Sequence, residues 1–348
     1  MLVSKIKNLK LQFNYTYALL GLLALVIIVL TILRGSMLWR IDIWLSMARQ
    51  FPEYGLMVLA IMFCFISGNI DISFVALGNF CAILAILLIQ ALGLDGYTAA
   101  FAIIIISLAL ASVCGLINGS LITRLRIPPI LATLSMHMVY RGITVGITDG
   151  HSVSGIPIEF SQMIRQTSIF GLRAIPFLVF VLVVLFNVFV LKYTSFGKKV
   201  YMIGSNPKAA KFSAIKTEKV VTIVFIIAAI ITTMGTLLMV AGMNSARADN
   251  GSAYLMRTIL ILVLAGVLPI GGIGKIVNVL IAIVTIQLIS SGVNMFPQLN
   301  VYYRELISAI ILLVVLMATS YLLGERKRTK TEHVRLDKRP RSILSKYI

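Results

Sequence analysis

Long apolar runs separated by short polar stretches fill most of this chain. A helix crosses the hydrocarbon core of a bilayer with about 20 apolar residues, and runs of about 17 also suffice. The predicted spans are 17–33, 54–67, 74–92, 98–122, 129–147, 175–191, 220–243, 254–268, 273–292 and 305–323. The pattern therefore predicts an all-α fold, a polytopic transmembrane helical bundle of about ten spans.

The composition supports lipid as the solvent of these runs. Hydrophobic residues make up 59% of the chain and charged residues 12%, whereas a soluble domain carries about 25% charged residues. No polar linker divides the runs, so we expect a cytoplasmic N-terminal segment over 1–16, one transmembrane domain over 17–323 and a basic cytoplasmic tail over 324–348. The N-terminal lysines resemble the start of a secretory signal, but no small-residue cleavage site follows, and we expect a retained first span.

The positions of the basic residues predict the orientation. A formal charge of +19 would suit a nucleic-acid binder, but the Lys and Arg residues lie between apolar runs and in the tail. When they are assigned by the positive-inside rule, 22 of the 31 fall on one side. We therefore predict that both termini and the loop over 192–219 are cytoplasmic.

Residues that often carry catalysis or bind metals are dispersed. Cys64, Cys81 and Cys114 lie inside apolar runs without metal-ligand spacing, so we expect them to pack as small apolar side chains. The phosphate-binding pattern G-x-x-x-x-G-K-[ST] does not occur. We expect no catalytic residue, no metal site and no bound cofactor on this chain, which also disfavours an intramembrane enzyme.

A polar stretch over 67–73 interrupts two apolar runs. It contains Asn69, Asp71 and Ser73, and a charge such as Asp71 at membrane depth needs a partner or a water-filled cavity. One interpretation is a broken helix that lines a solute path. The other is a tight turn in which Asp71 caps the next helix.

A second interruption, over 268–274, contains Pro269 and the glycines Gly271 and Gly272. As in the first interruption, a short predicted span precedes it and a longer one follows. Paired interrupted helices indicate a transport site between the two halves of a transporter. Glycine-rich turns between helices are the alternative explanation.

The largest predicted cytoplasmic loop contains a helix-start signal. Asn206 suits an N-cap and Pro207 the first helical position, so we expect a short helix from Lys208 to Ile215. This helix would place Ala209, Phe212 and Ile215 on one face. Such a helix would either dock on a soluble motor protein or lie on the lipid surface.

Three groups of short segments follow one another in a specific order. They are Gly68-Asn69-Ile70-Asp71-Ile72-Ser73; Gly115-Leu116-Ile117-Asn118-Gly119 with 125–130, 132–134 and 140–142; and Phe196-Gly197-Lys198 with 203–210 and 213–215. Together they resemble the permeases of ribose-, xylose- and arabinose-type ABC importers, including those for a sugar-like autoinducer signal. The resemblance covers about 55–325.

The resemblance implies a non-catalytic transport subunit in the bacterial inner membrane, a second permease subunit, ATP-binding subunits that use ATP, and an extracytoplasmic solute-binding protein. No nucleic-acid partner is implied. The family's ATPase-coupling loop falls here on Gly204, Asn206, Pro207, Ala209, Ala210, Phe212, Ser213 and Ile215. For the solute pathway we expect Asn69, Asp71, Ser73, Gly271 and Gly272. The carried solute would be a simple sugar or a sugar-like molecule.

The chain departs from the family pattern in informative places. Asn69 replaces a glycine, and Ala214 replaces a common glycine. In the second interruption two family hydroxyls are lost and Lys275 adds a cation. We therefore expect the partner permease to be a different chain. A stand-alone transporter that uses Asp71 as a proton or sodium site is the alternative function.

Overall fold

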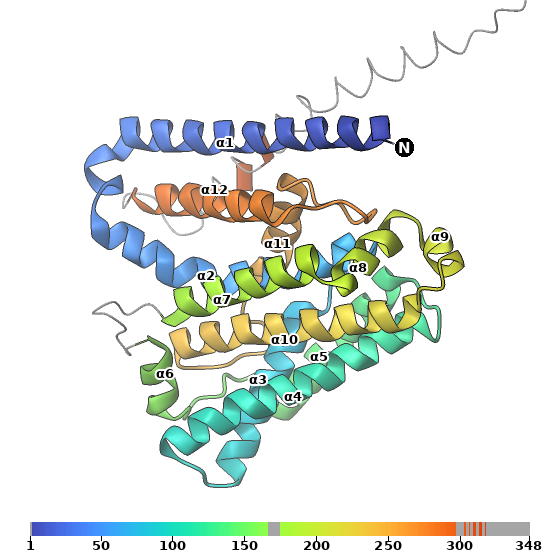
Figure 1. Ribbon diagram of the computed structural model, residues 1–348. Coiled ribbons are helices and arrows are strands. Elements are labelled where there is room, and N and C mark those ends of the chain that lie inside the picture. Colours follow the sequence, from blue (N-terminus) through green and yellow to red (C-terminus); the bar gives the residue numbers. More distant parts are fainter. Residues whose placement is uncertain are drawn as a thin grey trace, which may run out of the picture. The chain divides into compact units, whose positions relative to one another are not determined.

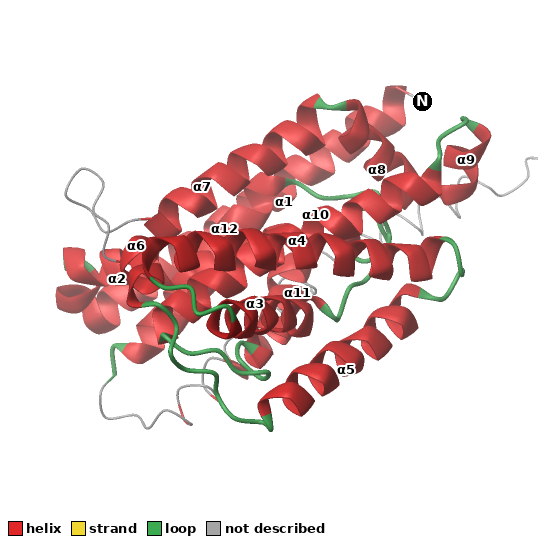
Figure 2. Ribbon diagram, turned by 90° about the horizontal axis from the view of Figure 1, so that it is seen from below, coloured by secondary structure: helices red, strands yellow, loops and turns green. Residues whose placement is uncertain are grey.

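The computed structural model describes residues 2–165 and 175–296, with scattered residues between 303 and 317, and side chains from residue 15 onward. These residues form helices and one isolated pair of bridged residues, Val153 and Ala246, but no strand (Figure 1, Figure 2). The helices are α1 (Leu2–Leu38), α2 (Ile41–Ile66), α3 (Phe74–Ala91), α4 (Gly96–Thr123), α5 (Pro129–Thr148), α6 (Ile158–Arg165), α7 (Ile175–Val188), the π-helix η1 (Phe189–Tyr193), α8 (Ser195–Ser205), α9 (Pro207–Phe212), α10 (Thr217–Met243), α11 (Ser252–Leu264) and α12 (Ile276–Asn294).

The chain forms two compact units, Met1–Leu288 and Ile289–Ile348. The first contains the helices from α1 to α11 and most of α12. The second contains the end of α12, and most of the predicted span over 305–323 and all of the basic tail lie outside the described residues.

Eight helices of the described part are long and apolar enough to cross a membrane, so the chain is an all-α, multi-pass membrane protein. They are α1, α2, α3, α4, α5, α7 together with η1, α10 and α12. The predicted span over 254–268 is different, because α11 has 13 residues and is about 20 Å long. A hydrocarbon core is about 30 Å thick, so α11 is too short to cross it.

The second predicted span begins earlier than its apolar residues suggest. We expected it to start at residue 54, whereas α2 starts at Ile41 and continues through Pro52 and Glu53. Glu53 is buried and paired with Arg165 of α6 at 3.1 Å. The ion pair with Arg165 compensates the buried charge of Glu53, so α2 can continue through a polar stretch that we expected to be a loop. The helix before the first interruption is therefore long rather than short.

Helix α10 packs against α2, α3 and α4 (Figure 1). Two glycines of α4, Gly115 and Gly119, lie against its backbone. A Cβ atom on them would stand 2.7 Å from the Cα of Ile226 and 2.8 Å from the Cα of Thr222. Small residues four apart let membrane helices approach closely. This crossing fixes α4, which contributes a residue to the site described next.

Candidate functional site

The two helix interruptions and the end of α8 meet through backbone atoms. The amide of Gly272 donates to the carbonyl oxygen of Ile66 at 2.8 Å. A Cβ atom on Gly204 would overlap that same carbonyl oxygen. A Cβ on Gly271 would stand 2.7 Å from both the Gly68 Cα and the Gly204 oxygen. We call Gly68, Gly204, Gly271 and Gly272 the glycine junction, because an added Cβ atom on Gly204, Gly271 or Gly272 would clash with backbone atoms.

Backbone conformation adds a second requirement at this junction. Gly68, Gly271 and Gly272 have φ angles of +80°, +84° and +75°. This left-handed region is readily accessible only to glycine. The junction therefore joins the loop between α2 and α3, the loop between α11 and α12, and the α8–α9 segment.

The first interruption is a turn closed by its own side chains. The Asp71 carboxylate accepts hydrogen bonds from the amide of Ser73 at 2.8 Å and from its hydroxyl at 2.6 Å. Asn69 donates to the Ser67 hydroxyl at 2.9 Å. Asn69, Asp71 and Ser73 are all buried. This geometry is that of a turn in which Asp71 stabilises the start of α3.

A chain of hydrogen bonds extends from this turn into α4 and α5. Asn118 donates to the Ser73 hydroxyl at 2.8 Å, and Tyr140 donates to Asn118 at 3.0 Å. The pKa of the Asp71 carboxyl is raised to about 6, because the effect of burial exceeds the opposite effect of the two hydrogen bonds from Ser73. These contacts satisfy a buried carboxyl group that has no ion-pair partner within the described part of the chain.

The loop predicted to dock on a motor protein contains two short helices. The Asn206 side chain accepts a hydrogen bond from the Ala209 amide at 3.1 Å, which confirms the predicted cap of α9. Helix α9 ends at Phe212 rather than Ile215, because Ala214 turns into the left-handed region with φ +57°. Helix α8 was not predicted from the sequence.

Exposure separates the residues of this loop into two groups. Phe212 is 92% exposed, whereas Ala210 is 1% exposed. Ala210 therefore packs inside this chain and supports the loop, while its part in docking stays a prediction. The remaining coupling candidates divide similarly: Gly204 is buried, Ile215 is partly exposed, and Asn206, Pro207, Ala209 and Ser213 are exposed.

The second interruption presents apolar side chains outward. Leu268, Ile270 and Ile273 are 36%, 77% and 54% exposed. Val267, next to Leu268, is buried. The Tyr201 hydroxyl of α8 donates to the Gly274 carbonyl at 2.7 Å. This bond is a further tie between α8 and the second interruption.

A group of polar side chains from α2, α6 and α11 was not predicted from the sequence. The Glu53 carboxylate accepts from Arg165 of α6 at 3.1 Å and from the Tyr254 hydroxyl of α11 at 3.3 Å. Tyr54 donates to Gln287 of α12 at 2.8 Å. The sequence offered one signal for this cluster, because Glu53 and Arg257 are charged residues close to the start of predicted spans. We call Glu53, Tyr54, Arg165, Tyr254, Arg257 and Gln287 the polar cluster.

A cavity of about 340 Å³ lies between α2, α7 and α12. Its lining is apolar apart from Gln287, and includes Trp44, Phe51 and Phe177. Such a lining lacks the hydrogen-bonding groups that a polyhydroxylated solute requires. We therefore do not place the solute in this cavity.

Comparisons with known proteins agree with this architecture. The family model described as "Branched-chain amino acid transport system / permease component" matches residues 43–316. The chain is 31% identical over 300 residues to the ribose import permease protein RbsC of Bacillus subtilis, covering 86% of this chain and 90% of that protein. It is 29% identical over 314 residues to the autoinducer 2 import system permease protein LsrD of Yersinia pseudotuberculosis, covering 88% and 92%. No solved structure matches.

Proposed function

Because this chain belongs to the branched-chain amino acid transport system / permease component family, we propose that it is the membrane-spanning permease subunit of an ATP-binding-cassette importer for a simple sugar or sugar-like solute. Two similar proteins are named for the import of ribose and of autoinducer 2. These names support a small polyhydroxylated solute.

The observation that carries this proposal is the glycine junction. It brings the end of α8, from which the chain continues into the exposed loop around Phe212, into direct backbone contact with both helix interruptions. A backbone contact without intervening side chains transmits displacement with little slack, because packed groups are not continuously deformable. A motor protein that moves the α8–α9 loop would thus shift both interruptions together.

We assign ATP hydrolysis to separate ATP-binding subunits and solute delivery to an extracytoplasmic binding protein. This chain would bind no cofactor and catalyse no reaction itself, and it would lie in the bacterial inner membrane. Binding and hydrolysis of ATP would then bias inward- and outward-open states of the permease. Five residues would keep the two interruptions aligned with the coupling loop during transport. They are Asn69, Asp71, Ser73, Gly271 and Gly272.

The ion-coupled alternative gains no support from the geometry around Asp71. Its carboxylate is occupied by two hydrogen bonds from Ser73 and lies in a buried turn. Under the importer proposal, Asp71→Asn leaves uptake dependent on ATP. Gradient-driven uptake in vesicles without ATP-binding subunits, lost on Asp71→Asn, would favour the alternative.

We further propose that the second permease subunit is a different chain. The exposed side chains of the second interruption, Leu268 among them, are apolar, so this subunit would contribute apolar contacts and its partner the polar ones. Purification together with the products of neighbouring genes tests this. A complex with two permease types is expected, and a complex with this permease alone contradicts the idea.

Phe212→Asp tests docking of the coupling loop. ATP-driven uptake of radiolabelled D-ribose and of autoinducer 2 is measured in vesicles that contain the whole complex. We expect uptake to fall at least about tenfold, because an aromatic anchor in an interface contributes about 2 kcal/mol. Stability of the chain should not change, since the ring is 92% exposed. Phe212→Leu, which keeps an apolar side chain, is the control, and unchanged uptake by Phe212→Asp at normal expression would overturn the docking role.

A further inference from the structure

Among the residues that the structure describes, Arg257 of α11 has no carboxylate partner. Its guanidinium lies over the Tyr54 ring at 5.5 Å and over the Tyr254 ring at 5.8 Å from the centroids. A guanidinium carries five N–H donors. Among residues 15–165 and 175–296, none accepts a hydrogen bond from it or forms an ion pair with it. An ionisable residue in an apolar membrane helix indicates a functional site.

The neighbours of Arg257 are held in place by other contacts. The carboxylate of Glu53 pairs with Arg165 at 3.1 Å and accepts from the Tyr254 hydroxyl. The Tyr54 hydroxyl is bound to Gln287. Both tyrosine hydroxyls and the Glu53 carboxylate are thus bound to other residues. The N–H groups of the Arg257 guanidinium therefore remain available to a ligand, and the two rings next to it are held in place.

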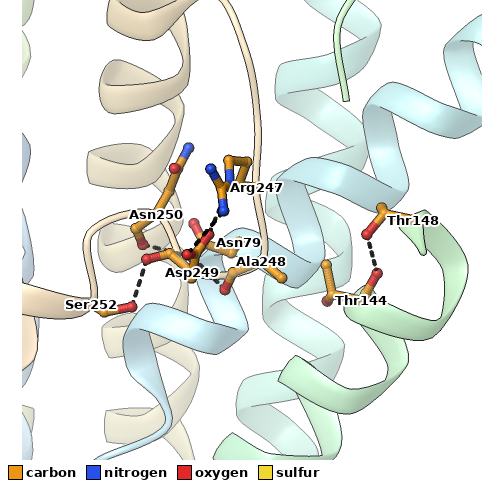
Figure 3. A network of polar contacts seen from close by, with 8 residues as sticks. All are labelled: Asn79, Thr144, Thr148, Arg247, Ala248, Asp249, Asn250 and Ser252. Carbon is orange, nitrogen blue, oxygen red and sulfur yellow. Dashed lines mark hydrogen bonds and ion pairs between the residues drawn. The ribbon is translucent and has the colours of Figure 1, made fainter. Parts of the chain in front are cut away.

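The loop before α11 is also fixed, so Arg257 is presented on a defined element. Asn79 of α3 donates to the carbonyls of Ala248 at 3.2 Å and of Asn250 at 2.8 Å (Figure 3). Figure 3 shows these residues gathered against α3 just before α11 begins at Ser252.

We propose that Arg257 and the ring of Tyr254 contact the transported solute, a polyhydroxylated molecule, during its passage. This inference rests on the proposed importer function. The side chains of Arg257 and Tyr254 are partly exposed. Tyr54 is only 2% exposed, and its ring packs against the guanidinium from inside the protein. A planar guanidinium donates two parallel hydrogen bonds to neighbouring oxygens, and an aromatic face packs against the C–H face of a sugar.

The test measures solute imported per ATP hydrolysed by the complete complex in vesicles. D-ribose and autoinducer 2 serve as probes at saturating loaded binding protein. We expect Arg257→Gln to lower import per ATP about tenfold, with ATP hydrolysis stimulated by the loaded binding protein within about twofold of the original value. Arg257→Lys should recover only part of the import, because it keeps the charge but loses the fork.

Arg247→Gln is the matched control, since Arg247 is an exposed arginine just before the same helix and is already paired. Unchanged import per ATP in Arg257→Gln overturns the inference, and full recovery by Arg257→Lys overturns the bidentate contact. If Arg257→Gln does not assemble, Arg257→Lys decides alone. A defect seen only in vesicles with anionic lipid would assign Arg257 to a lipid headgroup instead. Absence of ATP-driven uptake of both probes by the unmodified complex would overturn the proposed function, which is a separate result.

Discussion

The glycine junction and the polar cluster join distant parts of the chain by opposite means. At the junction, Gly68, Gly204 and Gly271 bring three backbone segments together without side chains. In the polar cluster, long side chains from α2, α6, α11 and α12 make the contacts through ion pairs, ring stacking and hydrogen bonds.

The two regions should therefore respond differently to substitution. The backbone contacts leave no room for a Cβ atom on Gly204, Gly271 or Gly272, and they carry no charge. Side-chain contacts can adjust, and they leave a donor group such as Arg257 available. We therefore expect the junction to transmit motion and the polar cluster to provide chemical selectivity.

Gly204→Ala should give the largest effect, because its Cβ would overlap the Ile66 carbonyl oxygen and stand 2.5 Å from the Gly272 amide nitrogen. We expect ATP-driven uptake to fall below about a tenth, with the α8–α9 loop displaced or the complex not assembled. Uptake and co-purification of the ATP-binding subunits are the measurements. Gly142→Ala is the control, since nothing lies within 4 Å of its added Cβ. Equal uptake by the two variants would show that the junction is not tight.

Glu53→Gln tests the polar cluster, and we expect an intermediate effect. It removes the charge that pairs with Arg165, whose side chain is 43% exposed, so solvent screening limits the loss to about 1 kcal/mol of unfolding free energy. Thermal unfolding of the purified protein in detergent measures the difference. Asp42→Asn, which breaks the exposed pair with Arg40, should change the midpoint less. The reverse order would mean that Glu53 does not help to hold α2, α6 and α11 together.

Ala214→Gly should give the smallest effect, and it should be stabilising. Ala214 has φ +57°, a conformation that disfavours alanine by about 1–2 kcal/mol relative to glycine. The greater freedom of glycine in the unfolded chain offsets part of this gain, so we expect a net increase of about 0.5 kcal/mol in unfolding free energy. The same unfolding measurement applies, with Ala209→Gly inside α9 as the destabilising control. A lower midpoint for Ala214→Gly would contradict this account of the loop end.

Much of the fold could be predicted from the sequence because lipid demands continuous apolar segments. The runs over 74–92, 98–122 and 129–147 agree with α3, α4 and α5 within two residues at each end. The Asn206 cap was also predictable, because it depends on a hydrogen bond three residues along the chain. The start of α2 was not predictable, because the burial of Glu53 depends on Arg165, more than a hundred residues away.

For the site, local composition was enough to identify the relevant segments, which are two glycine-containing interruptions and one basic loop. The helix packing was needed to show that Gly68, Gly204 and Gly271 lie in one place, that Ala210 points inward, and that Arg257 lies over the rings of Tyr54 and Tyr254. The physical reason is range. Propensity, capping and transfer into lipid act over a few residues, whereas close packing and charge pairing depend on the positions of helices that are far apart in the chain.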